Sequence, residues 1–97
     1  MYTINKQISQ QLYNKLKVDV LTKTDTFEII SISLEKNTIF PEHTSPKDAQ
    51  LLVLDGAIAF HCNGHVFHLE EQDLFNFPKA VIHWVQAKEN SKFIIIR

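Results

Sequence analysis

The sequence predicts a single all-β domain, and three observations support that prediction. Short runs of β-branched and aromatic residues follow one another, with polar turns about every eight to twelve residues. Asn63-Gly64 separates two such runs, and Asn-Gly is the strongest short-range signal of a β-hairpin. The chain has 97 residues, which is enough for one domain. It has only 2 glycines, which excludes a glycine-rich phosphate loop.

The start of the chain is less regular than the rest. Ile8, Leu12 and Leu16 recur at every fourth position, which is typical of a short amphipathic helix. An arm that crosses to a neighbouring subunit fits the same residues. We therefore predict an N-terminal arm or short helix over residues 1–17 and a β-barrel domain over residues 18–97.

From Val18 onward at least eight short runs read as strands, with the pattern of a sandwich or barrel and not of βαβ units. The expected strands are residues 18–22, 27–34, 38–40, 51–54, 57–62, 65–69, 74–77, 81–87 and 93–96. A two-residue type I′ turn at Asn63-Gly64 fixes the register of the hairpin. One apolar face of that hairpin then has three cross-strand pairs, which are Cys62 with His65, Phe60 with Phe67, and Ile58 with Leu69.

Several of these runs are apolar on both faces, above all 51–54, 93–96 and much of 27–34. A strand of a lone two-layer barrel needs only one buried face. The second apolar face therefore predicts a partner surface, and the simplest partner is another copy of the chain in a homodimer.

Composition narrows the function classes. The chain has 10 basic and 11 acidic residues, so no basic excess attracts nucleic acid or an anionic membrane. Its 1 cysteine, Cys62, cannot form an internal disulfide. Residues 1–13 lack the apolar core of a signal peptide, and no apolar run has the length of a membrane span. These features predict a soluble, cytoplasmic protein.

Two stretches, residues 41–56 and 72–83, contain a specific order of residues. The first has Pro41, His43 and the ending Val53-Leu54-Asp55-Gly56, and the second has Asp73, Pro78 and His83. These anchors resemble the two motifs of the cupin superfamily, in particular small single-domain, quercetin-dioxygenase-like cupins. The resemblance implies a jelly-roll β-barrel of six to eight strands or more, often homodimeric.

The same resemblance locates the metal ligands of metal-binding cupins, which are three residues of the first motif and one of the second. At those positions this chain has His43, Ser45, Ala49 and His83. Two imidazoles survive, but serine is a poor ligand and alanine is none. The resemblance thus implies no cofactor strongly. At most it implies a weakly bound divalent metal (Fe, Ni, Zn or Mn) on His43 and His83, with Asp48 or Gln50 as a third ligand.

In a cupin the barrel interior is the ligand pocket. The resemblance therefore implies a pocket lined by His43, His83, Gln50, Phe75 and Phe77. We predict a small-molecule-binding protein with a sensory or accessory role, without strong catalysis. The alternative is a metal-dependent enzyme of the dioxygenase or isomerase kind. A third hypothesis is a structural module whose pocket is packed shut by phenylalanines.

A second group of histidines, His61, His65 and His68, invites a zinc interpretation. The hairpin register argues against it, because His65 lies on the face opposite to His61 and His68. We predict that these three are surface or interface residues.

Overall fold

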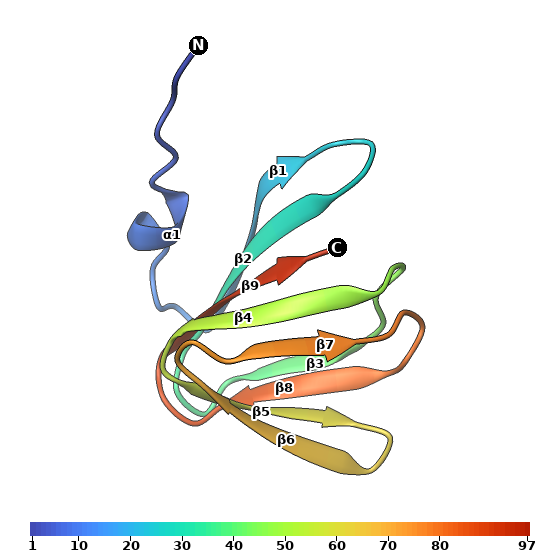
Figure 1. Ribbon diagram of the computed structural model, residues 1–97. Coiled ribbons are helices and arrows are strands. Elements are labelled where there is room, and N and C mark those ends of the chain that lie inside the picture. Colours follow the sequence, from blue (N-terminus) through green and yellow to red (C-terminus); the bar gives the residue numbers. More distant parts are fainter.

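The computed structural model describes residues 1–97, and its strands form two antiparallel sheets with the core between them (Figure 1). One sheet has the order β1-β2-β9-β4-β7 and the other the order β3-β8-β5-β6. The prediction of an all-β jelly-roll barrel is confirmed. The elements are α1 (Gln7–Gln10), β1 (Leu16–Lys23), β2 (Glu28–Leu34), β3 (Ile39–His43), β4 (Ala49–Asp55), β5 (Ala57–Cys62), β6 (His65–Glu70), β7 (Leu74–Phe77), β8 (His83–Ala87) and β9 (Ser91–Ile96).

A single hydrophobic core of 13 buried residues joins the two sheets. Both sheets alternate inward apolar residues with outward ones, as on β4, where Ala49, Leu51 and Val53 are buried. Phe60 of β5 and Phe93 of β9 are the largest fully buried side chains and come from opposite sheets. A shift of either strand by one residue would expose such side chains, so this alternation fixes the register.

The predicted hairpin is confirmed pair by pair, with Cys62 opposite His65, Phe60 opposite Phe67 and Ile58 opposite Leu69. Its turn has φ 50° at Asn63 and 73° at Gly64, as a type I′ turn requires.

One predicted strand ends later than expected, and the difference matters for the site. We expected a strand over 38–40, whereas β3 continues through Pro41 to His43. Proline lacks the N–H that a ladder needs, but β3 is an edge strand with a register shift between Phe40 and His43. The irregularity accommodates Pro41 and brings His43 opposite His83 of β8.

The N-terminal segment has both a short helix and an extended arm, and the helix does not follow the spacing of Ile8, Leu12 and Leu16. Only the four residues of α1 are helical, Leu12 is exposed, and Leu16 begins β1. The chain becomes extended at Gln11, whose ψ is 123°. Tertiary contacts of the extended arm override the weak helical spacing. No helix in the structure has the length and apolar character needed to cross a membrane.

The arm covers the outer face of β2. The Gln11 side chain is buried. Its Nε2 donates to Asp19 Oδ2 and to the Ser31 carbonyl, each at 3.0 Å. Its Oε1 accepts from Ser31 Oγ at 2.8 Å. Ser33 Oγ donates to the Leu12 carbonyl at 2.8 Å. The chain's own arm therefore buries the second face of β2, for which we expected a second subunit.

The homodimer stays a prediction. It now concerns the outward side chains of β4 and β9, such as Leu52, Ile94 and Ile96, which are only half-buried.

We predict that Gly56→Ala destabilises the fold far more than Gly64→Ala. Both residues have positive φ, which alone costs an alanine about 1 kcal/mol. A Cβ at Gly56 would also lie 2.4 Å from Asn90 O and 2.4 Å from Ser91 Oγ, whereas nothing lies within 4 Å at Gly64. Urea unfolding should show a loss of roughly 3 kcal/mol or more for Gly56→Ala. Equal losses for the two variants would contradict this prediction.

Gln11→Ala should release the arm from the sheet. The substitution leaves buried Ser31 Oγ without its acceptor, which costs about 2 kcal/mol. Limited proteolysis should then cleave the arm faster and leave residues 16–97 intact. The matched control is Gln10→Ala, because Gln10 is exposed. If the two variants were cleaved at the same rate, the buried Gln11 contacts would not hold the arm.

Candidate functional site

A cavity of about 250 Å³ lies between the two sheets. It runs from the core, at the fully buried Phe60, to the surface, at the exposed Val18. The residues that line it are Val18, Ile30, Ile32, Phe40, His43, Thr44, Ser45, Phe60, Phe77, His83, Val85, Ile95 and Arg97. Most of the wall is apolar, and the polar side chains come from β3, β8 and the segments after β3 and β9.

His43 and His83 lie side by side in this wall. They are cross-strand partners of β3 and β8, and their ring centroids are 4.2 Å apart at an interplanar angle of 70°. Phe40 stacks on His43 at 4.1 Å, and Phe60 stacks on His83 at 5.0 Å. Phe77 meets the edge of His83 at 4.9 Å. Aromatic neighbours on both sides thus hold the imidazoles in one orientation.

Both imidazoles use the same ring nitrogen to bond the backbone carbonyl two residues before them. Nδ1 of His43 lies 2.6 Å from the Pro41 carbonyl, and Nδ1 of His83 lies 2.9 Å from the Val81 carbonyl. A carbonyl only accepts, so each Nδ1 donates and each Nε2 of a neutral ring is an acceptor. No enclosed side-chain nitrogen or oxygen lacks a partner, so the unpartnered Nε2 of buried His83 must reach the open space of the cavity.

Burial lowers the pKa of His83 below its ordinary value of 6.5. Nearby His43 and Arg97 add to the effect, and the hydrogen bond to the Val81 carbonyl opposes it. His83 is therefore neutral at pH 7 and presents an acceptor to the cavity.

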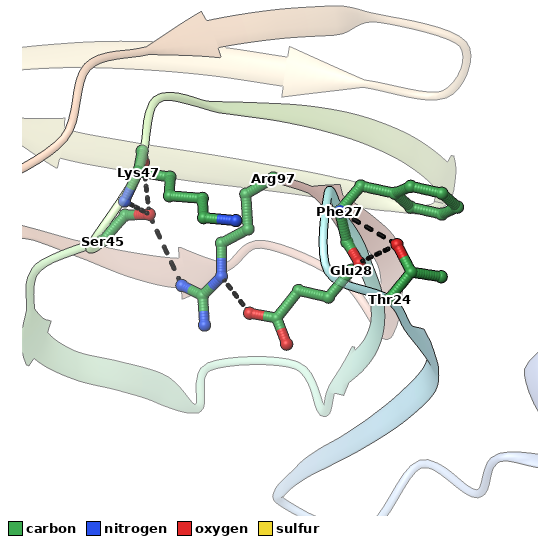
Figure 2. A network of polar contacts seen from close by, with 6 residues as sticks. All are labelled: Thr24, Phe27, Glu28, Ser45, Lys47 and Arg97. Atoms are coloured by element: carbon green, nitrogen blue, oxygen red, sulfur yellow. Dashed lines mark hydrogen bonds and ion pairs between the residues drawn. The ribbon is translucent and has the colours of Figure 1, made fainter.

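Arg97 also lines the cavity, and sequence reasoning missed it. Figure 2 shows its guanidinium between Ser45 and Glu28. Nε donates to Glu28 Oε1 at 2.6 Å, and Nη1 donates to Ser45 Oγ at 3.4 Å. A charged residue directly after the apolar run 93–96 was the available signal, because a charge next to a buried strand needs a partner.

The other predicted site residues fall in three places. Phe77 lines the cavity, while Phe75 packs between Phe60 and Phe67 at ring distances of 4.9 Å and is not part of the lining. Gln50 is exposed on the outer face of β4. The Asp48 carboxylate accepts from the Lys79 backbone N–H at 2.9 Å.

Asp48 and Gln50 instead border a separate hollow at the edge of the five-stranded sheet, beside Asn76 and Pro78. The structure therefore brings His43, His83 and Phe77 together and leaves Gln50, Asp48 and Phe75 outside the cavity.

The second histidine group does not form a cluster. His61 stacks on Trp84 with ring centroids 3.6 Å apart, and His68 Nδ1 contacts Lys88 Nζ. His65 is exposed near the hairpin turn. No group of three or more His, Cys, Asp or Glu side chains is placed to hold a metal ion, here or elsewhere in the chain.

Comparison with protein families identifies the fold. Residues 31–96, more than half of the chain, match the family model described as a cupin domain. The chain belongs to the cupin family. A comparison with curated proteins found none that matches this cupin.

Solved structures agree with the family assignment. An RmlC-like cupin from Desulfovibrio desulfuricans has a TM-score of 0.86 at 16% identity, over 99% of this chain and 95% of that one. A cupin superfamily protein from Desulfitobacterium hafniense has a TM-score of 0.80 at 21% identity, over 88% and 78% of the two chains. KdgF from Halomonas sp. has a TM-score of 0.74 at 19% identity, over 84% and 76%. At such identities these similarities show the fold alone.

The cupin barrel often holds a metal, but the side chains of this cavity do not fit one well. Two Nε2 atoms are suitable donors, and their Nδ1 contacts are those of metal-binding histidines. The remaining ligand positions have Ser45, which accepts a hydrogen bond from Arg97, and the buried Ala49. No carboxylate lines the cavity, and the positive guanidinium of Arg97 does. We therefore derive no chemistry through a metal.

The ion pair at the cavity entrance should make stability depend on acid. The hydrogen bond from Arg97 lowers the pKa of Glu28 below its ordinary value of 4.5, although partial burial opposes this shift. A lowered pKa in the folded state stabilises the fold above pH 4.5, and this contribution is lost as pH falls through the folded pKa.

We therefore expect Glu28→Gln to cost up to about 1 kcal/mol at pH 7 and nothing near pH 2. Thermal unfolding from pH 7 to pH 2 measures the difference. Glu42→Gln is the control, because Glu42 is exposed and has no ion pair. A Glu28→Gln deficit that stayed constant with pH would contradict the assignment.

Proposed function

We propose that this cupin binds a small molecule in the cavity between its sheets and has a sensory or accessory role. One observation carries the proposal: an apolar cavity in which two oriented imidazoles, His43 and His83, present acceptor atoms. A mostly apolar hollow with a few convergent polar groups is the usual form of a ligand site.

The size of the cavity limits the ligand. Sites for drug-sized ligands have volumes of about 300–1,000 Å³, and this cavity has about 250 Å³. The ligand is therefore a small metabolite. Its apolar part would be stabilised by roughly 25 cal/mol for each Å² removed from water against Ile32, Val85 and Ile95.

The cavity favours binding over catalysis. No Asp, Glu, Cys or Lys side chain lines it, so the imidazoles of His43 and His83 are its only candidates for a general base. A metal-dependent enzyme would need at least one further ligand, and Asp48 and Gln50 lie outside. The hypothesis of a barrel packed shut by phenylalanines does not agree with a cavity beside both histidines.

Fragment binding followed by amide chemical shifts tests the proposal. We expect small fragments to shift the amide signals of β3 and β8, and His83→Phe to weaken that binding at least tenfold. The matched control is His61→Phe, which removes an imidazole from the outer face of β5, where it stacks on Trp84. Shifts confined to outer faces, or equal effects of the two variants, would end the proposal.

A further inference from the structure

One of the two motif positions at which this chain has no metal ligand lies next to a positively charged side chain, Arg97. Ser45 stands at the second of the four ligand positions. Its hydroxyl oxygen accepts a hydrogen bond from Arg97 Nη1 at 3.4 Å. Arg97 directly follows β9 and lines the same cavity as His43 and His83. The positively charged guanidinium thus lies in the part of the cavity where a metal cation would have to bind.

Two hydrogen bonds hold the guanidinium of Arg97, but they do not use all of its N–H groups. Its Nε donates to Glu28 and one Nη1 proton is directed to Ser45, which leaves its other N–H groups without a protein partner. Glu28 fixes the plane of the group from the side of β2 (Figure 2). The edge formed by Nη1 and Nη2 matches the two oxygens of a carboxylate, which arginine binds through paired hydrogen bonds.

The charges of the lining point the same way. Among the side chains that line the cavity, Arg97 is the only one with a fixed charge, and none is acidic. An anion that enters the cavity therefore meets a positive group, whose acidic partner Glu28 stands outside the lining. In the apolar surroundings of Ile30, Ile95 and Phe77, such a charge-assisted contact is stronger than it would be in water.

The imidazoles add a second requirement. His43 and His83 offer Nε2 acceptors, which a carboxylate alone cannot satisfy because it has no proton to donate. A hydroxyl on the same ligand can donate to one of them. We infer that the cavity binds a small hydroxy-carboxylate, with its carboxylate on Arg97 and its hydroxyl on the histidine pair.

This inference rests on the proposed function and names its ligand class. One guanidinium edge can pair with two oxygens of a carboxylate or of a phosphate, so the charge and the further oxygens of the ligand decide between them in favour of the carboxylate. A phosphate would bring further charge and further oxygens, for which the wall has no second cation.

Matched pairs of acid and ester test the inference. Lactate, 3-hydroxybutyrate and salicylate, each beside its methyl ester, are titrated into the ¹⁵N-labelled full chain at pH 7.5 and low salt, with inorganic phosphate as a further probe. We expect at least one acid to shift the amide signals of Arg97 and His83, and to bind at least tenfold more tightly than its ester. Butyrate should bind more weakly than 3-hydroxybutyrate, because it lacks the hydroxyl.

Two variants separate the guanidinium from its ion pair. Arg97→Gln and Glu28→Gln both remove the Arg97–Glu28 pair, but only Arg97→Gln removes the positive charge. We expect Arg97→Gln to abolish the preference for acid over ester and Glu28→Gln to keep it. Equal loss in both variants, or no loss in Arg97→Gln, would overturn the inference.

The inference and the proposed function fail differently. If the esters bind in the cavity as well as the acids, or if only uncharged fragments bind there, the carboxylate class is wrong and small-molecule binding stands. Phosphate binding as tight as that of the acids also excludes the carboxylate class. If no fragment of any kind binds in the cavity, both proposals fail.

Discussion

The position of β9 in the middle of the larger sheet is the constraint on which the rest of the structure depends. β9 pairs with β2 on one side and with β4 on the other, so within the five-stranded sheet it alone joins the β1–β2 hairpin to β4 and β7. Its inward residues Phe93 and Ile95 belong to the core, and its outward Lys92 donates to the Ile8 carbonyl of the arm at 2.7 Å. Arg97, at its end, reaches the cavity. Core, arm and site therefore all require that the last strand is in place, which makes the fold rich in long-range contacts.

Much of this fold could be predicted from local pattern, because a hairpin is specified by adjacent residues. Asn63-Gly64 determined both a turn and a register, and the structure has the same pairs. The arm could not be predicted in this way. Whether Gln11 continues a helix or lies over β2 depends on Ser31, which is distant in sequence and provides its buried partner. The same contact explains why β2 is buried on both faces, a pattern from which the sequence alone predicted a second subunit.

The site was predictable where motif and strand alternation agree. His43 and His83 stand at motif positions, and the structure places them 4.2 Å apart as cross-strand neighbours. Motif spacing alone misplaced Gln50. Its neighbours Ala49 and Leu51 are apolar and buried, so the alternation of side chains along β4 turns Gln50 outward. Arg97 lies outside both motifs. Only the closing of the barrel brings it beside Ser45, and no spacing rule applies to residues that meet in this way.

Because Ser45 and Ala49 stand at two of the four ligand positions, the charges in this barrel are arranged differently from those of a metal site. A buried metal cation is stabilised where a negative ligand such as a carboxylate balances its charge. In this cupin the cation is Arg97, which is covalently part of the chain, and its balance is Glu28 at the entrance. Glu28 pairs with Arg97 from outside the cavity lining. Arg97 therefore has a partner without any ligand, and it still has N–H groups directed to no protein atom. His83, which its burial keeps neutral, adds an acceptor without adding charge. The cavity thus combines one compensated cation with two acceptors in an apolar wall, which suits a ligand that has both an anionic and a donor group.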